Sequence, residues 1–162
     1  MIRFLLVLVF AFNLHLHAQH RPHAFGLELG GSGLAYSLNY EHQSANGFVK
    51  RIGLSLYPAD LFVPLQIGKV FGKRIHHFEV GAGLTYIYDG PGRVIVIPRT
   101  HGVVPTAFIG YRYQNPQRRV YWRMGFTPVV FLDYHDDHKK AIFFPWVGVG
   151  FGFRIESLRS GQ

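Results

Sequence analysis

The segment that most constrains the fold is residues 145–155, which read PWVGVGFGFRI. Side chains alternate between the two faces of a strand, so one face of this segment carries Val147, Val149, Phe151, Phe153 and Ile155, and the other is mostly glycine. A water-soluble sheet would place polar groups on the less apolar face. Glycine also weakens a strand unless another group approaches it closely. The pattern predicts the wall of a narrow barrel whose outer face lies in lipid.

Composition agrees with a membrane β-barrel and not with a helical membrane protein. The 162 residues are enough for one domain, and no run approaches the roughly 18 apolar residues that a membrane helix needs. The chain has 19 glycines and 16% aromatic residues, a pairing that recurs in barrels with aromatic girdles. No segment keeps the apolar spacing of an amphipathic helix.

The N-terminus has the pattern of an export signal. Arg3 precedes the apolar run of residues 4–12, and Ala18 offers a small residue for cleavage. We therefore expect a signal peptide over residues 1–18 and a barrel domain over residues 19–162. A short N-terminal anchor is the alternative, although the apolar run is too short to span a bilayer.

Charge and cysteine content narrow the expected partners. The formal net charge is +8, and an exported basic protein is expected to meet anionic lipid headgroups and not nucleic acid. The chain has no cysteine, so its stability must come from packing and closed hydrogen bonding. We expect no cofactor and a monomer.

Period-two alternation recurs along the remaining chain in runs separated by turn residues. Whether residues 31–33 form a tight turn between two strands or a bulge in one long strand stays open. The connections after the second, fourth and sixth strands are short, whereas residues 89–102 and 133–140 are long. The sequence therefore predicts an all-β fold, an eight-stranded antiparallel up-and-down transmembrane barrel with both termini in the periplasm. The expected strands are residues 23–30, 34–41, 48–57, 63–71, 77–89, 103–114, 120–131 and 145–155.

The same alternation directs a set of charged side chains toward the barrel interior. An arginine on the lipid face near the midplane would cost about 2–4 kcal/mol, whereas opposite charges inside can pair. An eight-stranded barrel has an interior that side chains just fill, so these residues are expected to form a plug. A gated conduit or a small ligand site is the alternative. The expected interior charges are Glu28, Glu41, Glu79, Arg51, Arg112, Arg123 and Arg154.

Several short motifs stand in the expected strands: residues 28–31 (ELGG), 36–41 (YSLNYE), 51–53 (RIG), 79–83 (EVGAG), 110–113 (GYRY) and 123–128 (RMGFTP). Together they resemble small, mostly uncharacterised outer-membrane β-barrel proteins of Bacteroidota-type bacteria. The resemblance implies an eight-stranded barrel in the outer membrane, inserted by the barrel insertion machinery, and it implies no catalytic residues. Many such proteins end on an aromatic residue, whereas here Phe153 is followed by residues 154–162.

The expected long loops carry two candidate binding sites. His135, Asp136 and His138 have the ligand types and spacing for Zn²⁺ or a similar ion, although charge clusters are common on outer loops. A second group consists of basic side chains, which are expected to bind lipopolysaccharide phosphates. General adhesion to an anionic surface is the alternative. That group is Arg93, Arg99, Lys139 and Lys140.

The expected function is an integral outer-membrane protein with a structural or surface-interaction role and no enzymatic activity. A lipid hydrolase or acyl-transfer barrel is one alternative, but the inward-facing serines, Ser37 and Ser55, have only His77 on the same face, near the far end. The other alternative is an exported lipocalin-like barrel, which would reverse the two faces and hold an apolar ligand inside.

Overall fold

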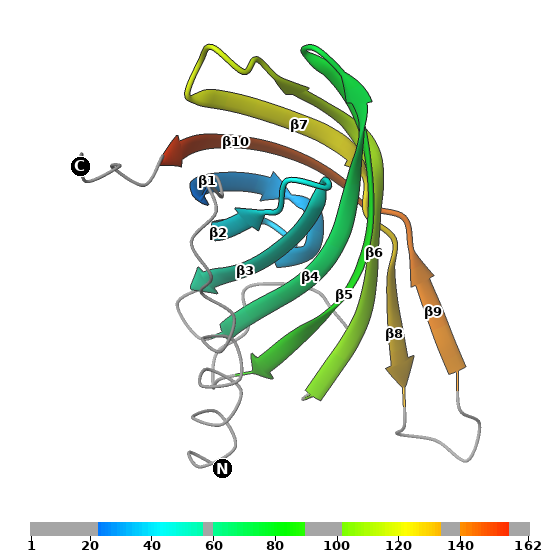
Figure 1. Cartoon of the computed structure of the whole chain (residues 1–162). Coiled ribbons are helices and arrows are strands. Elements are labelled where there is room, and N and C mark those ends of the chain that lie inside the picture. The colour runs from blue at the N-terminus through cyan, green and yellow to red at the C-terminus, as the bar shows by residue number, and fades with distance from the viewer. Residues whose placement is uncertain (1–22, 57–59, 90–101, 134–139, 156–162) are drawn as a thin grey trace.

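The computed structural model describes residues 23–56, 60–89, 102–133 and 140–155, which form a curved antiparallel sheet (Figure 1). In this part of the chain the sheet has ten strands. No helix among the described residues has the length and apolar character needed to cross a membrane. The strands are β1 (His23–Gly30), β2 (Tyr36–Gln43), β3 (Phe48–Leu56), β4 (Asp60–Lys73), β5 (His76–Asp89), β6 (Gly102–Gln114), β7 (Val120–Phe126), β8 (Val129–Asp133), β9 (Lys140–Phe144) and β10 (Val147–Ile155).

Eight of the described strands close into a barrel. Each of β1 to β6 pairs with the next strand along the chain, and β10 pairs with both β7 and β1. All of these pairings are antiparallel, as the sequence predicted for an up-and-down barrel. A closed wall leaves no open sheet edge, which is the condition for strands to span a bilayer.

The β8–β9 hairpin extends the barrel beyond the expected wall. The sequence predicted one strand over residues 120–131, but the ladder breaks at residues 127–128, and β8 then pairs with β9 in a hairpin that projects past the wall (Figure 1). Pro128 and Pro145 lie at the two breaks and have no N–H to donate to a ladder. The chain stays tied across the breaks because the Thr127 N–H donates to the carbonyl of Trp146 at 2.7 Å.

Residues 31–33 form a turn between two strands and not a bulge in one. Strands β1 and β2 pair antiparallel on either side of η1 (Gly31–Gly33), a single 3₁₀ turn. Gly30 and Gly31 have φ of 71° and 68°, a conformation that glycine adopts without steric cost. Leu34 has a φ of 68°, which is uncommon for a residue with a branched side chain. The turn therefore has a strained geometry, and its residues Gly31, Ser32 and Gly33 are all buried.

The two faces of the wall have opposite chemistry. Val147 and Phe151 of β10 are 63% and 55% exposed, and Leu84 and Ile109 are also exposed, whereas Arg112 is 0% exposed. The apolar side chains thus point outward and the charged ones inward. This arrangement contradicts the lipocalin-like alternative, which required the faces to be reversed.

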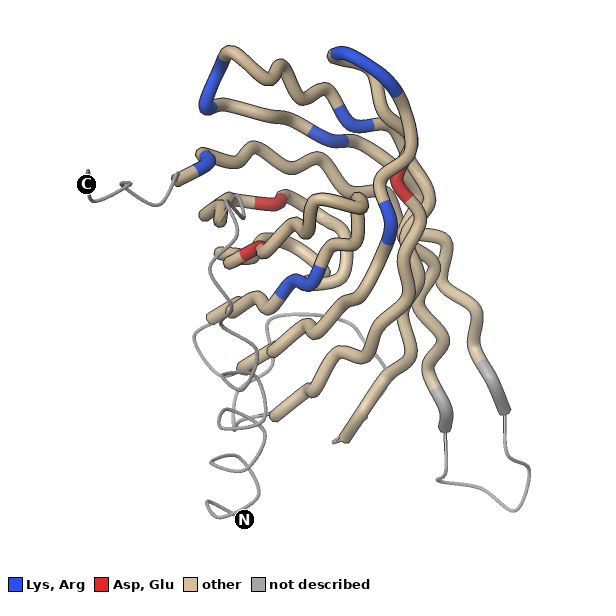
Figure 2. Tube along the Cα trace, viewed as in Figure 1, with Lys and Arg blue, Asp and Glu red and all other residues tan. Residues whose placement is uncertain are grey.

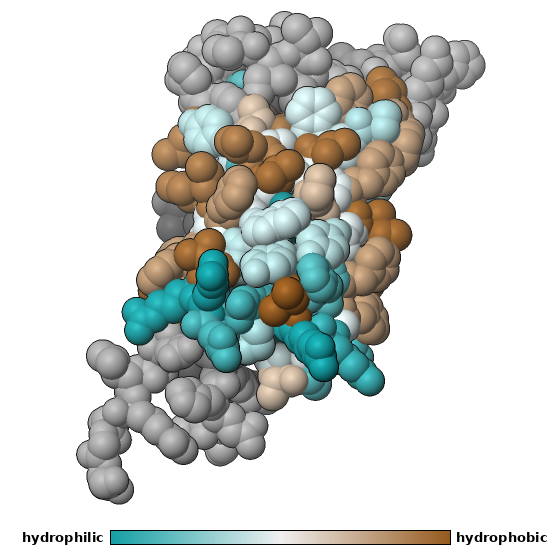
Figure 3. Space-filling model, turned by 90° about the horizontal axis from the view of Figure 1, so that it is seen from above, coloured by the Kyte–Doolittle hydropathy of each residue, from teal (hydrophilic) through white to brown (hydrophobic). Residues whose placement is uncertain are grey.

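Aromatic residues form a band near the end of the barrel where the β4–β5 and β6–β7 turns lie. His76, Tyr113 and Trp122 are neighbours across three strands, and the Tyr113 and Trp122 rings stack with centroids 6.0 Å apart. Beyond this band lie the cationic turns, seen as blue segments at the top of Figure 2. Figure 3 shows, on one face, brown apolar side chains over much of the wall, pale residues beside them and teal residues toward one end. This order is typical of a barrel that crosses from hydrocarbon to headgroups.

Candidate functional site

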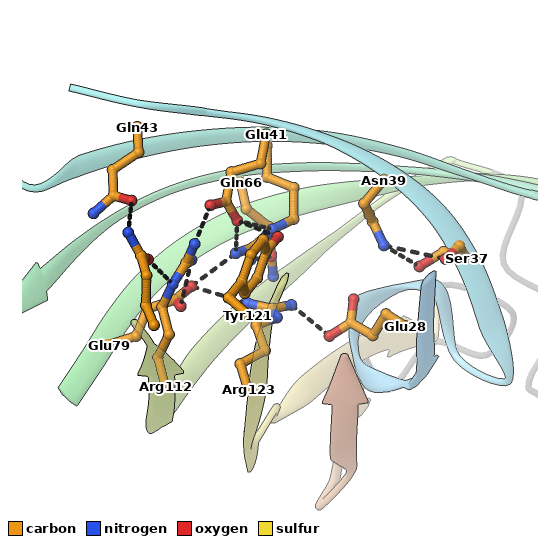
Figure 4. A network of polar contacts seen from close by, with 12 residues as sticks. Glu28, Ser37, Asn39, Glu41, Gln43, Gln66, Glu79, Arg112, Tyr121 and Arg123 are labelled. Atoms are coloured by element: carbon orange, nitrogen blue, oxygen red, sulfur yellow. Dashed lines mark hydrogen bonds and ion pairs between the residues drawn. The ribbon is translucent and has the colours of Figure 1, made fainter. Parts of the chain in front are cut away.

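Three arginines and three glutamates form one buried ion-pair network inside the barrel (Figure 4). The six residues come from six different wall strands, β1 to β3 and β5 to β7, so the network links the wall across its interior. Formal charges within the network cancel. The six residues are Glu28, Glu41, Glu79, Arg51, Arg112 and Arg123, each at most 5% exposed.

Arg112 of β6 is the most buried of these side chains. Its guanidinium bridges two carboxylates, donating to Glu41 Oε1 at 2.5 Å and to Glu79 Oε2 at 3.2 Å. Its Nε donates to Gln114 Oε1 at 2.7 Å, and the guanidinium lies 3.9 Å from the centre of the Tyr121 ring. Arg112 therefore uses the planar fork and the stacking face that distinguish arginine from lysine.

Arg51 of β3 bridges the same two carboxylates from the other side. Its Nη2 donates to Glu41 Oε2 at 2.5 Å and to Glu79 Oε1 at 2.9 Å. Its Nε also donates to Glu41 Oε2 at 3.2 Å, and its Nη1 donates to Gln66 Oε1 at 3.0 Å. The Tyr121 hydroxyl donates to Glu41 Oε2 at 3.2 Å. Both oxygens of Glu41 and both oxygens of Glu79 are thus paired with guanidinium groups.

Arg123 of β7 connects this cluster to β1. It donates to Glu79 Oε1 at 2.9 Å and to Glu28 Oε1 at 2.5 Å, and it lies 4.3 Å from the centre of the Phe108 ring. Removing one partner of a buried ion pair is strongly destabilising because the other charge stays uncompensated. The six residues are therefore expected to act as one unit in stability.

The glycines of β10 are explained by what approaches them from inside. A Cβ at Gly152 would lie 2.2 Å from Cε1 of Tyr121, and one at Gly150 would lie 3.2 Å from the Arg123 side chain. A Cβ at Gly148 would lie 2.8 Å from the Cα of Gly31, in the inward turn. The missing side chains on this face thus leave room for the ion-pair network and for η1.

The η1 turn fills the interior beyond the network. Thr85 Oγ1 donates to the carbonyl of Ser32 at 3.0 Å, and Trp146 Nε1 donates to the carbonyl of Leu34 at 2.6 Å. These bonds hold the turn against β5 and against the chain just before β10. The turn therefore covers the end of the network from which the long loops leave.

Sequence reasoning missed an apolar cluster that continues the interior past η1. Phe62, Ile87 and Val104 have the same inward parity as the buried polar residues of their strands, and this shared parity was the available signal. The interior thus changes from ionic to apolar along the barrel axis. The cluster consists of Leu34, Phe62, Ile87, Val104, Val129 and Phe131.

One expected member of the network lies elsewhere. Arg154 is half-buried near the end of β10, and its Nη2 donates to the backbone carbonyls of Asn115 and Arg118. It therefore ties β10 to the β6–β7 turn, and the assignment of Arg154 to the carboxylate cluster was wrong. Inward parity was insufficient here because the side chain starts at the rim, where backbone carbonyls are within reach.

The loop candidates fall mostly outside the described residues. This holds for His135, Asp136 and His138, and for Arg93, Arg99 and Lys139. Lys140 is the first residue of β9, where it stands opposite Asp133 in the ladder. Within the described ranges no cluster of three or more histidine or acidic residues has metal-binding geometry.

The two inward serines contact groups that do not activate a nucleophile. Ser37 accepts a bond from the Asn39 side chain at 2.9 Å, and Ser55 donates to the carbonyl of Tyr36. Both serines are fully buried. A serine nucleophile requires a neighbouring base and access to substrate, whereas these two hydroxyls contact an amide side chain and a backbone carbonyl.

Comparisons with known proteins do not show a family for this chain. No family model matches the chain, and no curated protein does. Among solved structures, the chain is similar to the outer membrane protein AlkL, determined by solid-state NMR in DMPC bilayers, with 10% identity, a TM-score of 0.38 and coverage of 91% of this chain and 96% of that one. The assignment of class rests on the closed wall, the apolar outer face and the paired interior charges. These features define a membrane-spanning β-barrel.

Proposed function

We propose that this protein is an integral outer-membrane barrel with a closed interior and a structural or surface-interaction role. The observation that carries the proposal is the charge-balanced network of six buried residues from six wall strands. Charges that line an aqueous pore remain solvated, whereas these side chains are bonded to each other and withdrawn from solvent.

Two further observations support a closed interior. The η1 turn and the apolar cluster lie in line with the network on the side of the long loops. Two small cavities beside Arg51 have volumes of about 10 Å³, which is room for at most about one water molecule. Solute passage would require the network and the turn to move together.

The proposed orientation places both termini and the short turns in the periplasm and the long loops outside the cell. Barrels of this class have short periplasmic turns and longer outer loops. The proposed partners are outer-membrane lipid, lipopolysaccharide at the outer loops and the barrel insertion machinery. The cationic residues of the long loops are the proposed lipopolysaccharide contacts.

The test is to reconstitute the full chain in planar bilayers and record current. Heat-modifiable gel migration of the same sample verifies that the barrel is folded. The proposal predicts no stepwise conductance from the folded barrel, and steady unitary openings would contradict the closed interior. Cleavage within residues 89–102 on intact cells is expected for the proposed orientation, whereas protection of both long loops would contradict it.

The enzyme alternative has its own readout. A lipid hydrolase or acyl-transfer barrel would change the mass of lipid A or the phospholipid pool when its gene is deleted. We expect mass spectra of extracted lipids from the deletion strain to match those of the parent. An altered acyl-chain number that the wild-type gene restores would overturn the non-enzymatic role.

A further inference from the structure

An apolar groove lies on the outer face of the barrel. It has a volume of about 900 Å³, which is within the range of small-molecule sites. Its walls are exposed apolar side chains from neighbouring strands, and an outer face of this kind needs an apolar partner. The lining comes mainly from β10, β1, β2 and β3 and includes Phe25, Leu27, Leu38, Ile52, Leu54 and Phe151.

Basic and imidazole groups stand at one end of this groove. His23, His42 and Lys50 are direct cross-strand neighbours on β1, β2 and β3. They have the same outward parity as the groove residues two positions further along their strands, so the two rows are about 7 Å apart. Tyr40, which lines the groove, is bonded through its hydroxyl to His23 Nδ1 at 2.6 Å.

A further cation flanks the groove from the other side. Phe153 of β10 lines the groove, and the guanidinium of Arg119 lies 6.0 Å from the centre of its ring. Arg119 belongs to the β6–β7 turn, which lies at the same end of the barrel as His23 and Lys50. The apolar groove therefore has cationic groups on both sides of one end and mostly apolar side chains along its length.

We propose that this groove binds the acyl chain of a glycerophospholipid, whose anionic headgroup is attracted to the cationic end that His42 and Lys50 form on one side and Arg119 on the other. The inference rests on the proposed membrane insertion and deepens it by naming a specific lipid contact. The proposed orientation places this end in the periplasmic leaflet, where the available anionic lipid is a phospholipid. A symmetric contact with a second copy would bring like charges together, whereas a phosphate neutralises them.

The test measures lipid binding to the full-length protein purified in detergent. Phosphatidylglycerol is titrated, and bound lipid is counted by native mass spectrometry. Leu38→Trp fills the groove, and Leu84→Trp is its matched control on β5, across the barrel. The double variant Lys50→Gln/Arg119→Gln removes the charges, with Lys73→Gln/Arg118→Gln as its control. Diacylglycerol, which lacks a phosphate, tests the headgroup contact.

We expect Leu38→Trp to lose the tightest-bound phosphatidylglycerol and Leu84→Trp to keep it. Lys50→Gln/Arg119→Gln is expected to weaken binding at least tenfold, since each basic residue near anionic lipid contributes about fivefold. Diacylglycerol should bind more weakly than phosphatidylglycerol and be insensitive to the charge variant.

Three outcomes would overturn the site. Leu38→Trp could bind lipid as well as Leu84→Trp, both charge variants could lose equal affinity, or Leu38→Trp could instead dissociate a dimer. Heat-modifiable migration and resistance to carbonate extraction are recorded for every variant. A folded, membrane-inserted protein without the expected lipid pattern refutes this site alone, whereas failure of the wild type to insert refutes the proposed function.

Discussion

Removing the Arg112 guanidinium tests whether the interior network holds the barrel together. We consider Arg112→Met, which keeps much of the side-chain length and removes the charge. The variant loses two contacts to carboxylates, the bond to Gln114 and the stacking on Tyr121. Glu41 and Glu79 are then left with one buried negative charge in excess. Breaking a buried pair in this way costs about 3–5 kcal/mol.

The compensating variant removes the excess charge. Glu41→Gln/Arg112→Met leaves two glutamates, Glu28 and Glu79, facing the two remaining arginines, Arg51 and Arg123. Charges balance again, so the double variant should be less destabilised than the sum of its single variants. Residues in one such network couple by about 0.5–3 kcal/mol.

The assay is urea unfolding of the barrel in lipid vesicles, followed by tryptophan fluorescence. Arg118→Met in the exposed β6–β7 turn is the control and should stay within about 0.5 kcal/mol of wild type. An Arg112→Met barrel within about 1 kcal/mol of wild type would refute the reasoning. Strict additivity of the two single variants would refute it as well.

Three further predictions concern the wall and the turn. Gly152→Ala should lower the free energy of unfolding by about 1–3 kcal/mol because its Cβ would lie 2.2 Å from the Tyr121 ring. The loss should be smaller in a Tyr121→Ala background, and equal losses in the two backgrounds would contradict the close approach. Leu84→Arg, on the exposed face near the middle of β5, should lower the free energy of unfolding in vesicles by about 2–4 kcal/mol, whereas Tyr88→Arg near the strand end should lower it by about 0–1 kcal/mol. Equal and negligible losses would indicate that this face lies in water. Trp146→Phe removes the donor to the Leu34 carbonyl and should lower the free energy of unfolding by about 1–3 kcal/mol. Amide hydrogen exchange in residues 30–35 should become faster, and unchanged exchange there would show that the turn does not depend on this bond.

The parity of apolar residues was enough to predict the wall. Period two is a local property, so Val147 and Phe151 could be assigned to one face and Arg112 and Arg123 to the other from sequence neighbours alone. The turn residues between the alternating runs then predict where the strands of the barrel begin and end. Antiparallel pairing of consecutive strands then leaves closure by β10 as the one long-range step.

Other features could not be predicted from the alternation of side chains, because they depend on contacts between residues that are distant in the sequence. The η1 turn is bonded through the Leu34 carbonyl to Trp146, which lies 112 residues further along the chain. Arg154 has inward parity, but backbone carbonyls at the rim were better placed to accept its bonds than the carboxylates. The β8–β9 hairpin follows the same alternation as the wall, and only the two prolines mark where it leaves the barrel.

The most direct test of the account is whether the apolar face meets acyl chains. The chain has no native cysteine, so single cysteines can carry a nitroxide at Leu84 and Ile109, on the outer face, and at Arg118, in the exposed β6–β7 turn. Accessibility to oxygen and to a polar nickel complex is then measured in reconstituted vesicles. The account predicts that labels at positions 84 and 109 collide with oxygen and are shielded from nickel, and that the label at position 118 is accessible to nickel. Nickel access at 84 and 109 equal to that of a label at Arg118 would contradict it.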